Sequence, residues 1–331
     1  MSDYSDYDGE DDNIDIDNDI IEQDGEDNLE NVTENSLNDE NIREGLSLLC
    51  KTGNGISHAY VRLDVHDKNL TDINKISNFI HLRYLDISGN NLKDISPLNH
   101  LTHLLTLKAD RNLLTSARLE ELPYLQSASF AHNAITSTEG ISHPLLESLI
   151  LSFNNIVDVR GLDQQKLAKL QTLELRANKL TSVEHLTLPK LKNLYLAANL
   201  IDNLNGIDKL VQLRTLHMRD NAIKSLDGFT DNMKHLQYIN LRGTNIDDIK
   251  EVSKLKCLPL LRAVVLSESP VADENDYRIE ILIALRRLER LDKEEYNEDE
   301  RQEAEEINEQ RRQEEQLQKG AEEVIQSDEE S

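Results

Sequence analysis

The side chains of this chain that could carry out chemistry are scattered and form no catalytic motif. His100 and His103 have a metal-ligand spacing of three residues, but no third ligand accompanies them. The two cysteines, Cys50 and Cys257, offer neither a paired metal motif nor a disulfide framework, which is typical of a reducing compartment. No glycine-rich phosphate loop, H-E-x-x-H or C-x-x-C sequence occurs. We therefore expect no enzyme activity, no catalytic residue, no metal site and no cofactor.

Tyrosine and arginine side chains offer a different chemistry, the recognition of another protein, because these residues dominate binding hot spots. Small residues surround Ile150 and Phe153, so an apolar partner could approach closely there. The alternative is an ordinary solvated sheet, in which Glu174 and Asp220 pair with neighbouring arginines. The predicted protein-binding residues are Ile150, Phe153, Arg176, Tyr195, His217, Arg219, Tyr238 and Arg242.

Apart from Phe153, these candidates occupy three outward positions of a repeated apolar frame, L-x-x-L-x-L-x-x-N-x-I/L. Its asparagines recur at spacings of 21 to 24 residues, at Asn90, Asn112, Asn133, Asn154, Asn178, Asn199 and Asn221. Such a period is the signature of a leucine-rich repeat, which buries its apolar face by stacking on its neighbours. The sequence predicts an α/β solenoid of about ten repeats of ~22 residues, with a parallel concave sheet that presents the candidates outward.

The segments after each asparagine predict the outer side of the solenoid. Ile95, Leu98 and Leu101 are spaced by three, which suits 3₁₀ or short helical returns. The asparagine amides are expected to bond buried backbone groups of adjacent coils. Thr244 and Ser269 occupy the same position near the end of the array, where their hydroxyls could replace the amide.

Charge divides the chain into a neutral body and two acidic tails. Residues 1–40 contain 17 acidic and no basic residues, and residues 292–331 contain 17 acidic and 5 basic ones. We expect 1–40 to be disordered and 41–62 to cap the array, with Ile42, Leu46 and Leu49 on one helix. The remaining predicted parts are repeats over 63–269, a C-terminal cap over 270–292, and an acidic helical tail over 293–331 with a disordered end. Gly320 is predicted to end that helix.

The same charge distribution excludes several partners. Acidic tails would repel the phosphates of nucleic acid and of anionic membranes. The first residues lack a secretory signal, and no stretch approaches the roughly 18 apolar residues needed to span a bilayer. The sequence predicts a soluble intracellular protein without a small-molecule substrate.

Two groups of residues resemble known families. The C-terminal cap of the Sds22-like class of leucine-rich repeats is matched by Pro270, Tyr277, Arg278, Leu288, Leu291 and Asp292, although Ser269 replaces the usual asparagine. Segments 43–65, 81–110, 121–144 and 188–201, including CKTGNG and EGISHP, resemble the family of leucine-rich repeat-containing protein 23. This resemblance implies a non-catalytic structural subunit in the head region of the third radial spoke, in the axoneme of motile cilia or flagella. It implies other radial spoke head proteins as partners and a role in motility.

Two other functions remain open from the sequence. The repeat class alone suggests a regulatory subunit of a type 1 protein phosphatase. The acidic tails suggest a chaperone of basic proteins such as histones.

Overall fold

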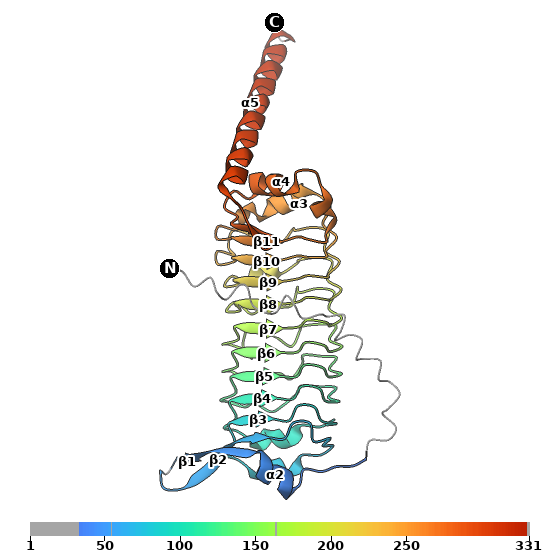
Figure 1. The fold of residues 1–331 in the computed structure, drawn as a ribbon, viewed down its shortest axis with the longest axis vertical. Coiled ribbons are helices and arrows are strands. Elements are labelled where there is room, and N and C mark those ends of the chain that lie inside the picture. The colour runs from blue at the N-terminus through green and yellow to red at the C-terminus, as the bar shows by residue number, and fades with distance from the viewer. Residues whose placement is uncertain (1–32, 54, 163, 330–331) are drawn as a thin grey trace.

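A thirteen-stranded open sheet forms the backbone of the molecule in the computed structural model, which describes residues 33–53, 55–162 and 164–329. The strands are stacked in chain order along one axis (Figure 1). All pairs from β2 (His58–Asp64) to β12 (Arg290–Leu291) are parallel, and the sheet ends in antiparallel pairs with β1 (Leu46–Lys51) and β13 (Glu294–Glu295). The strands between are β3 (Tyr84–Asp86), β4 (Thr106–Lys108), β5 (Ser127–Ser129), β6 (Ser148–Ile150), β7 (Thr172–Glu174), β8 (Asn193–Tyr195), β9 (Thr215–His217), β10 (Tyr238–Asn240) and β11 (Ala263–Val265).

The apolar frame of the repeats supplies the core. In each of the strands β3 to β11 the central residue, such as Leu85, Leu149 or Leu216, points inward and is buried. Its two neighbours point to the other face, because side chains alternate along a strand. The predicted class, an α/β leucine-rich repeat solenoid, is confirmed.

The asparagine ladder bonds each coil to the one before it. The Nδ2 group of Asn90 donates to the carbonyl oxygens of Val65 at 3.0 Å and Ile87 at 2.9 Å, and its Oδ1 accepts the N–H of Leu70 at 2.9 Å. All seven asparagines are buried. One side chain therefore satisfies groups of two coils at the point where the strand has ended.

Hydroxyl groups continue this ladder at its C-terminal end, as predicted. The hydroxyls of Thr244 and Ser269 donate to the carbonyl oxygen of Leu241 at 2.8 and 3.1 Å. The Ser269 hydroxyl also accepts the N–H of Thr244 at 3.0 Å.

The outer side of the solenoid consists of turns and short helices. The predicted 3₁₀ geometry is confirmed at η4 (Ser96–His100), where the N–H groups of Leu98 and Leu101 donate three residues back at 3.0 and 2.9 Å. The other short helices of this side are η3 (Asn74–Asn78), η5 (Ile207–Lys209), α3 (Ile249–Ser253), η6 (Lys254–Cys257) and η7 (Pro270–Asp273).

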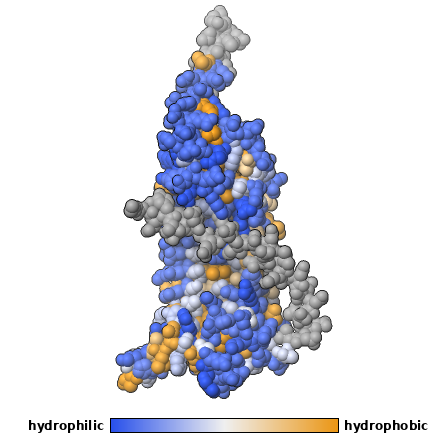
Figure 2. Space-filling view, in the orientation of Figure 1, coloured by the Kyte–Doolittle hydropathy of each residue, from blue (hydrophilic) through white to orange (hydrophobic). Residues whose placement is uncertain are grey.

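The N-terminal cap differs from the predicted single helix. Helix α2 spans Asp39–Gly45, with the Asn38 side chain accepting the N–H of Asn41 at 2.9 Å, and it buries Ile42. Leu46 and Leu49 were expected on the same helix, but they lie on strand β1, where Leu49 is 58% exposed. The reason is the open edge of β2, whose unpaired backbone groups are satisfied by an antiparallel strand. Figure 2 shows hydrophobic residues gathered on this hairpin.

The C-terminal tail also departs from its predicted limits. A β12–β13 hairpin turns at Asp292 and Lys293, both with positive φ. Helix α5 then spans Glu298–Glu329 and begins with a reciprocal capping box, in which Asn297 and Glu300 bond each other's backbone N–H at 2.9 Å. The predicted helix end at Gly320 is wrong. A glycine costs a helix only about 1 kcal/mol, which its helix-favouring neighbours offset.

Two expectations lie outside the described residues. These are the predicted disorder of residues 1–32 and that of residues 330–331. Residues 33–40 were also predicted to be disordered, but this prediction is wrong, because Leu37 is buried and its N–H donates to the carbonyl oxygen of Asp72 at 2.8 Å. Over the described ranges, no helix is both long and apolar enough to cross a membrane.

Candidate binding surface

The outward residues of the concave sheet form rows of direct neighbours. The third residues of adjacent strands pair in register, which places Ile150, Glu174, Tyr195, His217 and Asn240 side by side. The first residues form a second row, in which Thr215 is the neighbour of Tyr238. The repeat spacing produces this order, because each repeat returns the chain to the same edge about 4.8 Å further on.

An aromatic ladder (Tyr195, His217 and Tyr238) crosses strands β8 to β10. The rings of Tyr195 and His217 are stacked with centroids 4.8 Å apart, and those of His217 and Tyr238 are 5.0 Å apart. The guanidinium of Arg176 lies 5.7 Å from the Tyr195 ring. These ring and cation contacts connect four predicted binding residues, although Tyr238 belongs to the row of first strand residues, and they hold the rings against one another.

Ion pairs hold the arginines of this surface. Arg176 bonds Glu174 at 2.8 Å, and Nε of Arg219 lies 3.6 Å from Asp220. These are the pairs expected for a solvated sheet. Arg242 bonds Glu268 at 2.6 Å.

Several predicted residues are less accessible than the alternation of strand residues suggests. Tyr238 is 7% exposed, and Arg219 is 9% exposed. Tyr195 and His217 remain half-buried and present their accessible edges on the concave face. The accessible part of the ladder is therefore centred on Tyr195 and His217.

Ile150 and Phe153 lie apart from the ladder. Phe153 follows β6 in the left-handed conformation, with φ of 55°, and its ring stacks on His132 with centroids 4.2 Å apart. Ile150 pairs with Ser129 on one side and with Glu174 on the other, and Ser127 and Ser148 form the adjacent pair of first strand residues. His132 was not among the predicted binding residues. It occupies the position directly before a ladder asparagine, Asn133, just as Phe153 directly precedes Asn154, and this shared position could have indicated the contact.

Two buried polar atoms lie between the Ile150 region and the ladder. The hydroxyl of Ser152 and Nε of Arg176 have no hydrogen-bond partner within the part of the chain that the structure describes. Ser152 follows β6 and Arg176 follows β7, so these residues are neighbours on adjacent coils. Unpaired buried groups carry a desolvation cost, which makes this the least satisfied part of the sheet.

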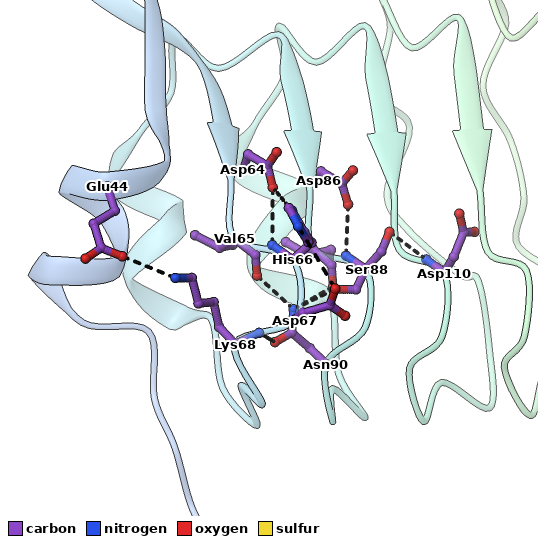
Figure 3. A network of polar contacts seen from close by, with 11 residues as sticks. Glu44, Asp64, Val65, His66, Asp67, Lys68, Asp86, Ser88, Asn90 and Asp110 are labelled. Atoms are coloured by element: carbon purple, nitrogen blue, oxygen red, sulfur yellow. Dashed lines mark hydrogen bonds and ion pairs between the residues drawn. The ribbon is translucent and has the colours of Figure 1, made fainter.

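The N-terminal end of the concave face is acidic (Figure 3). Asp64 hydrogen-bonds the ring of His66 and thereby raises its pKa. Asp86 accepts the N–H of Ser88 at 3.0 Å, and Lys68 pairs with Glu44 of α2 at 3.2 Å. Among the described residues no group of three or more His, Cys, Asp or Glu could hold a metal ion. The charge of the face therefore changes from acidic at this end to arginine-rich beyond β7.

Comparisons with known proteins agree with this architecture. Family models described as leucine-rich repeat match residues 167–321 and 81–104. Leucine-rich repeat-containing protein 23 of Bos taurus is 54% identical over 265 residues, which cover 80% of this chain and 78% of that protein. The protein of the same name from Mus musculus is 53% identical over 304 residues, covering 90% and 89%.

A solved structure shows the same fold. A leucine-rich repeat protein of Leptospira interrogans superposes with a TM-score of 0.56 at 23% identity, over 69% of this chain and 59% of that one.

Proposed function

The chain belongs to the family of leucine-rich repeat-containing protein 23, and from this premise we propose that it is a non-catalytic, protein-binding scaffold of the axonemal radial spoke. Its place is the head region of the third spoke, in cilia or flagella, where it supports motility. Its partners are other radial spoke head proteins. The segments that lie outside the repeat consensus, CKTGNG and EGISHP, support this assignment, because a leucine-rich repeat does not demand them.

The aromatic ladder is the observation that carries the binding function. Tyr195 and His217 are stacked on each other and flanked by Arg176 and Tyr238, so their side chains lose little freedom on association. Tyrosine and arginine at the centre of a rigid face favour a strong contact. A preorganised surface of this kind favours a permanent structural assembly.

The proposal is tested by the fate of the protein in demembranated axonemes. We expect it to remain with the axoneme after detergent extraction and to leave at high salt. A Tyr195→Ala/His217→Ala variant should move largely to the detergent-soluble fraction, because the accessible part of the ladder is removed. Leu200→Ala is the matched control, since Leu200 is 58% exposed and lies outside the sheet.

Crosslinking mass spectrometry on the same axonemes identifies the neighbours. The proposal requires crosslinks from Lys108, Lys192 or Lys293 to spoke head proteins. A wild-type chain found wholly in the soluble fraction of ciliated cells would contradict it.

A further inference from the structure

A groove of about 460 Å³ lies at the C-terminal end of the solenoid, between η6, the end of α4 (Tyr277–Ala284) and α5. Its apolar lining includes Leu255, Leu258, Leu261 and Leu288, all of them buried. Asn308 and Arg312 of α5 close one side. The groove therefore exists because α5 packs against the cap.

Four cationic side chains line this groove, and its lining contains no Asp or Glu. They are Lys256, Arg286, Arg287 and Arg312, all exposed. Within the described residues, none of the four forms an ion pair; Arg287 donates only to the carbonyl oxygen of Pro259 at 3.3 Å.

Other arginines of the cap are neutralised. Arg278 bonds Glu300 at 2.8 Å, and Arg262 bonds Glu289 at 3.1 Å. Arg311 pairs with Glu280, whereas the next residue, Arg312, faces the groove. In a chain with a net charge of −27, unpaired cations around an apolar floor are complementary to an acidic segment that also carries apolar side chains.

The chain itself contains such a segment. Residues 13–21 read NIDIDNDII, with aspartates alternating with Ile14 and Ile16 and preceding Ile20 and Ile21. We infer that the groove binds residues 13–21 of this same chain, with the isoleucines on the leucine floor and the aspartates beside the four cations. The inference is independent of the radial spoke assignment.

The length of the N-terminal segment permits this contact. The described chain is attached to the first coil, where the N–H of Leu37 donates to the carbonyl of Asp72 at 2.8 Å. Asp72 follows β2 and Leu255 follows β10, so eight strand spacings separate them, or roughly 38 Å. The 20 residues from Ile14 to Thr33 make 19 steps along the chain, which span up to about 63 Å when extended. The segment can reach the groove without disturbing the fold.

Carbodiimide crosslinking of the full chain tests the contact directly, because it joins lysine to carboxylate. We expect crosslinks from Lys256 to Asp15, Asp17 or Asp19 within one chain, independent of protein concentration and lost at high salt. Crosslinks found only between two chains would assign the groove to the tail of a second copy and overturn the inference. Absence of any crosslink from Lys256 to the tail would also overturn it.

Charge reversal locates the site. A labelled peptide of residues 10–24 is titrated into the chain lacking residues 1–32. Arg286→Glu/Arg312→Glu should weaken its binding at least tenfold. The control, Lys190→Glu/Lys192→Glu, changes the charge equally at another basic hollow, lined by Lys169, Lys190 and Lys192, and should have little effect. Equal losses in both variants, or loss only in the control, would reject the groove.

Two further titrations test whether the isoleucines contribute to binding and whether the chain's own tail occupies the groove. A peptide with Ile14→Ser and Ile16→Ser keeps its charge and should bind several-fold more weakly. The full chain should bind the unmodified peptide about tenfold more weakly than the shortened chain, because its own tail occupies the groove. Equal affinity of the full and shortened chains would show that the tail does not occupy the groove.

Discussion

The hydroxyl of Tyr277 donates a hydrogen bond of 3.0 Å to Oδ2 of Asp292 and so joins α4 to the end of the sheet. The other oxygen, Oδ1, accepts the backbone N–H groups of Leu266 and Ser267 at 2.7 and 2.8 Å. One carboxylate thus bonds the backbone just beyond β11, where the array ends. Burial, and then the charge of Asp292, raise the pKa of Tyr277, so its hydroxyl remains a donor.

Removing this carboxylate should destabilise the cap. Asp292→Ala leaves two backbone N–H groups without their acceptor, and we expect a loss of roughly 2–4 kcal/mol in the free energy of unfolding. Tyr277→Phe removes one hydrogen bond and should cost about 1 kcal/mol. Urea unfolding measures both variants. A smaller loss for Asp292→Ala than for Tyr277→Phe would show that the backbone bonds do not matter.

Replacing one asparagine of the ladder should lower the free energy of unfolding more than replacing an exposed asparagine. Asn178 donates to the carbonyl oxygens of Leu151 and Leu175 at 2.9 and 3.1 Å and accepts the N–H of Ile156 at 2.9 Å. Asn178→Leu leaves these buried groups unpaired, and we expect a loss of about 3 kcal/mol or more. Asn205→Leu is the control, because Asn205 is exposed. Thermal unfolding compares them, and similar melting temperatures would argue against the ladder's role.

The repeats were predictable because their determinants are local and periodic. The spacing of the asparagines fixes the coil, and the alternation of strand residues fixes which side chains face outward. Tyr195, His217 and Tyr238 could therefore be placed on one face from the sequence. Their stacking could not, because it depends on ring orientations between neighbouring coils.

The ends of the array were less predictable. Leu46 and Leu49 fit a helical period, but the unpaired edge of β2 recruits them into a strand. The start of α5 has a local signal in the capping box of Asn297 and Glu300, but the attachment of the helix to the cap depends on contacts between distant residues, such as Arg278 with Glu300. Apolar periodicity carries no information on these partners, which is why the predicted boundaries at both ends shifted.

His143 should make the protein sensitive to mild acid. It is 2% exposed, accepts the N–H of Leu122 at Nδ1 at 3.2 Å, and burial lowers its pKa to about 4. The unfolded chain binds a proton below pH ~6.5 whereas the folded chain does not, so stability falls as the pH drops from there toward about 4. When the pH falls from 7.5 to 5, we expect this residue to lower the free energy of unfolding by roughly 2 kcal/mol.

Urea unfolding at several pH values isolates this contribution. His143→Gln cannot titrate, so the difference in stability between wild type and variant should shrink as the pH falls. Parallel pH profiles for the two proteins would refute the assignment.

The first turns of α5 should loosen when its ion pair with the cap is removed. Nε of Arg278 donates to Glu300 at 2.8 Å, and the guanidinium lies 4.7 Å from the ring of Tyr296. We expect Glu300→Ala to raise amide hydrogen exchange over residues 298–304 about tenfold, because the capping box is lost as well. Glu303→Ala is the control, since Glu303 is exposed.

The same ion pair should make the start of α5 sensitive to pH. The hydrogen bond from Arg278 lowers the pKa of Glu300. The stabilising effect of the ionised Glu300 is therefore present above the ordinary glutamate pKa and is lost as the pH falls through the lowered value. Wild-type exchange in this segment should therefore rise toward that of Glu300→Ala in acid, after correction for intrinsic rates. If Glu303→Ala loosened the segment as much as Glu300→Ala, the helix would not be held by this pair.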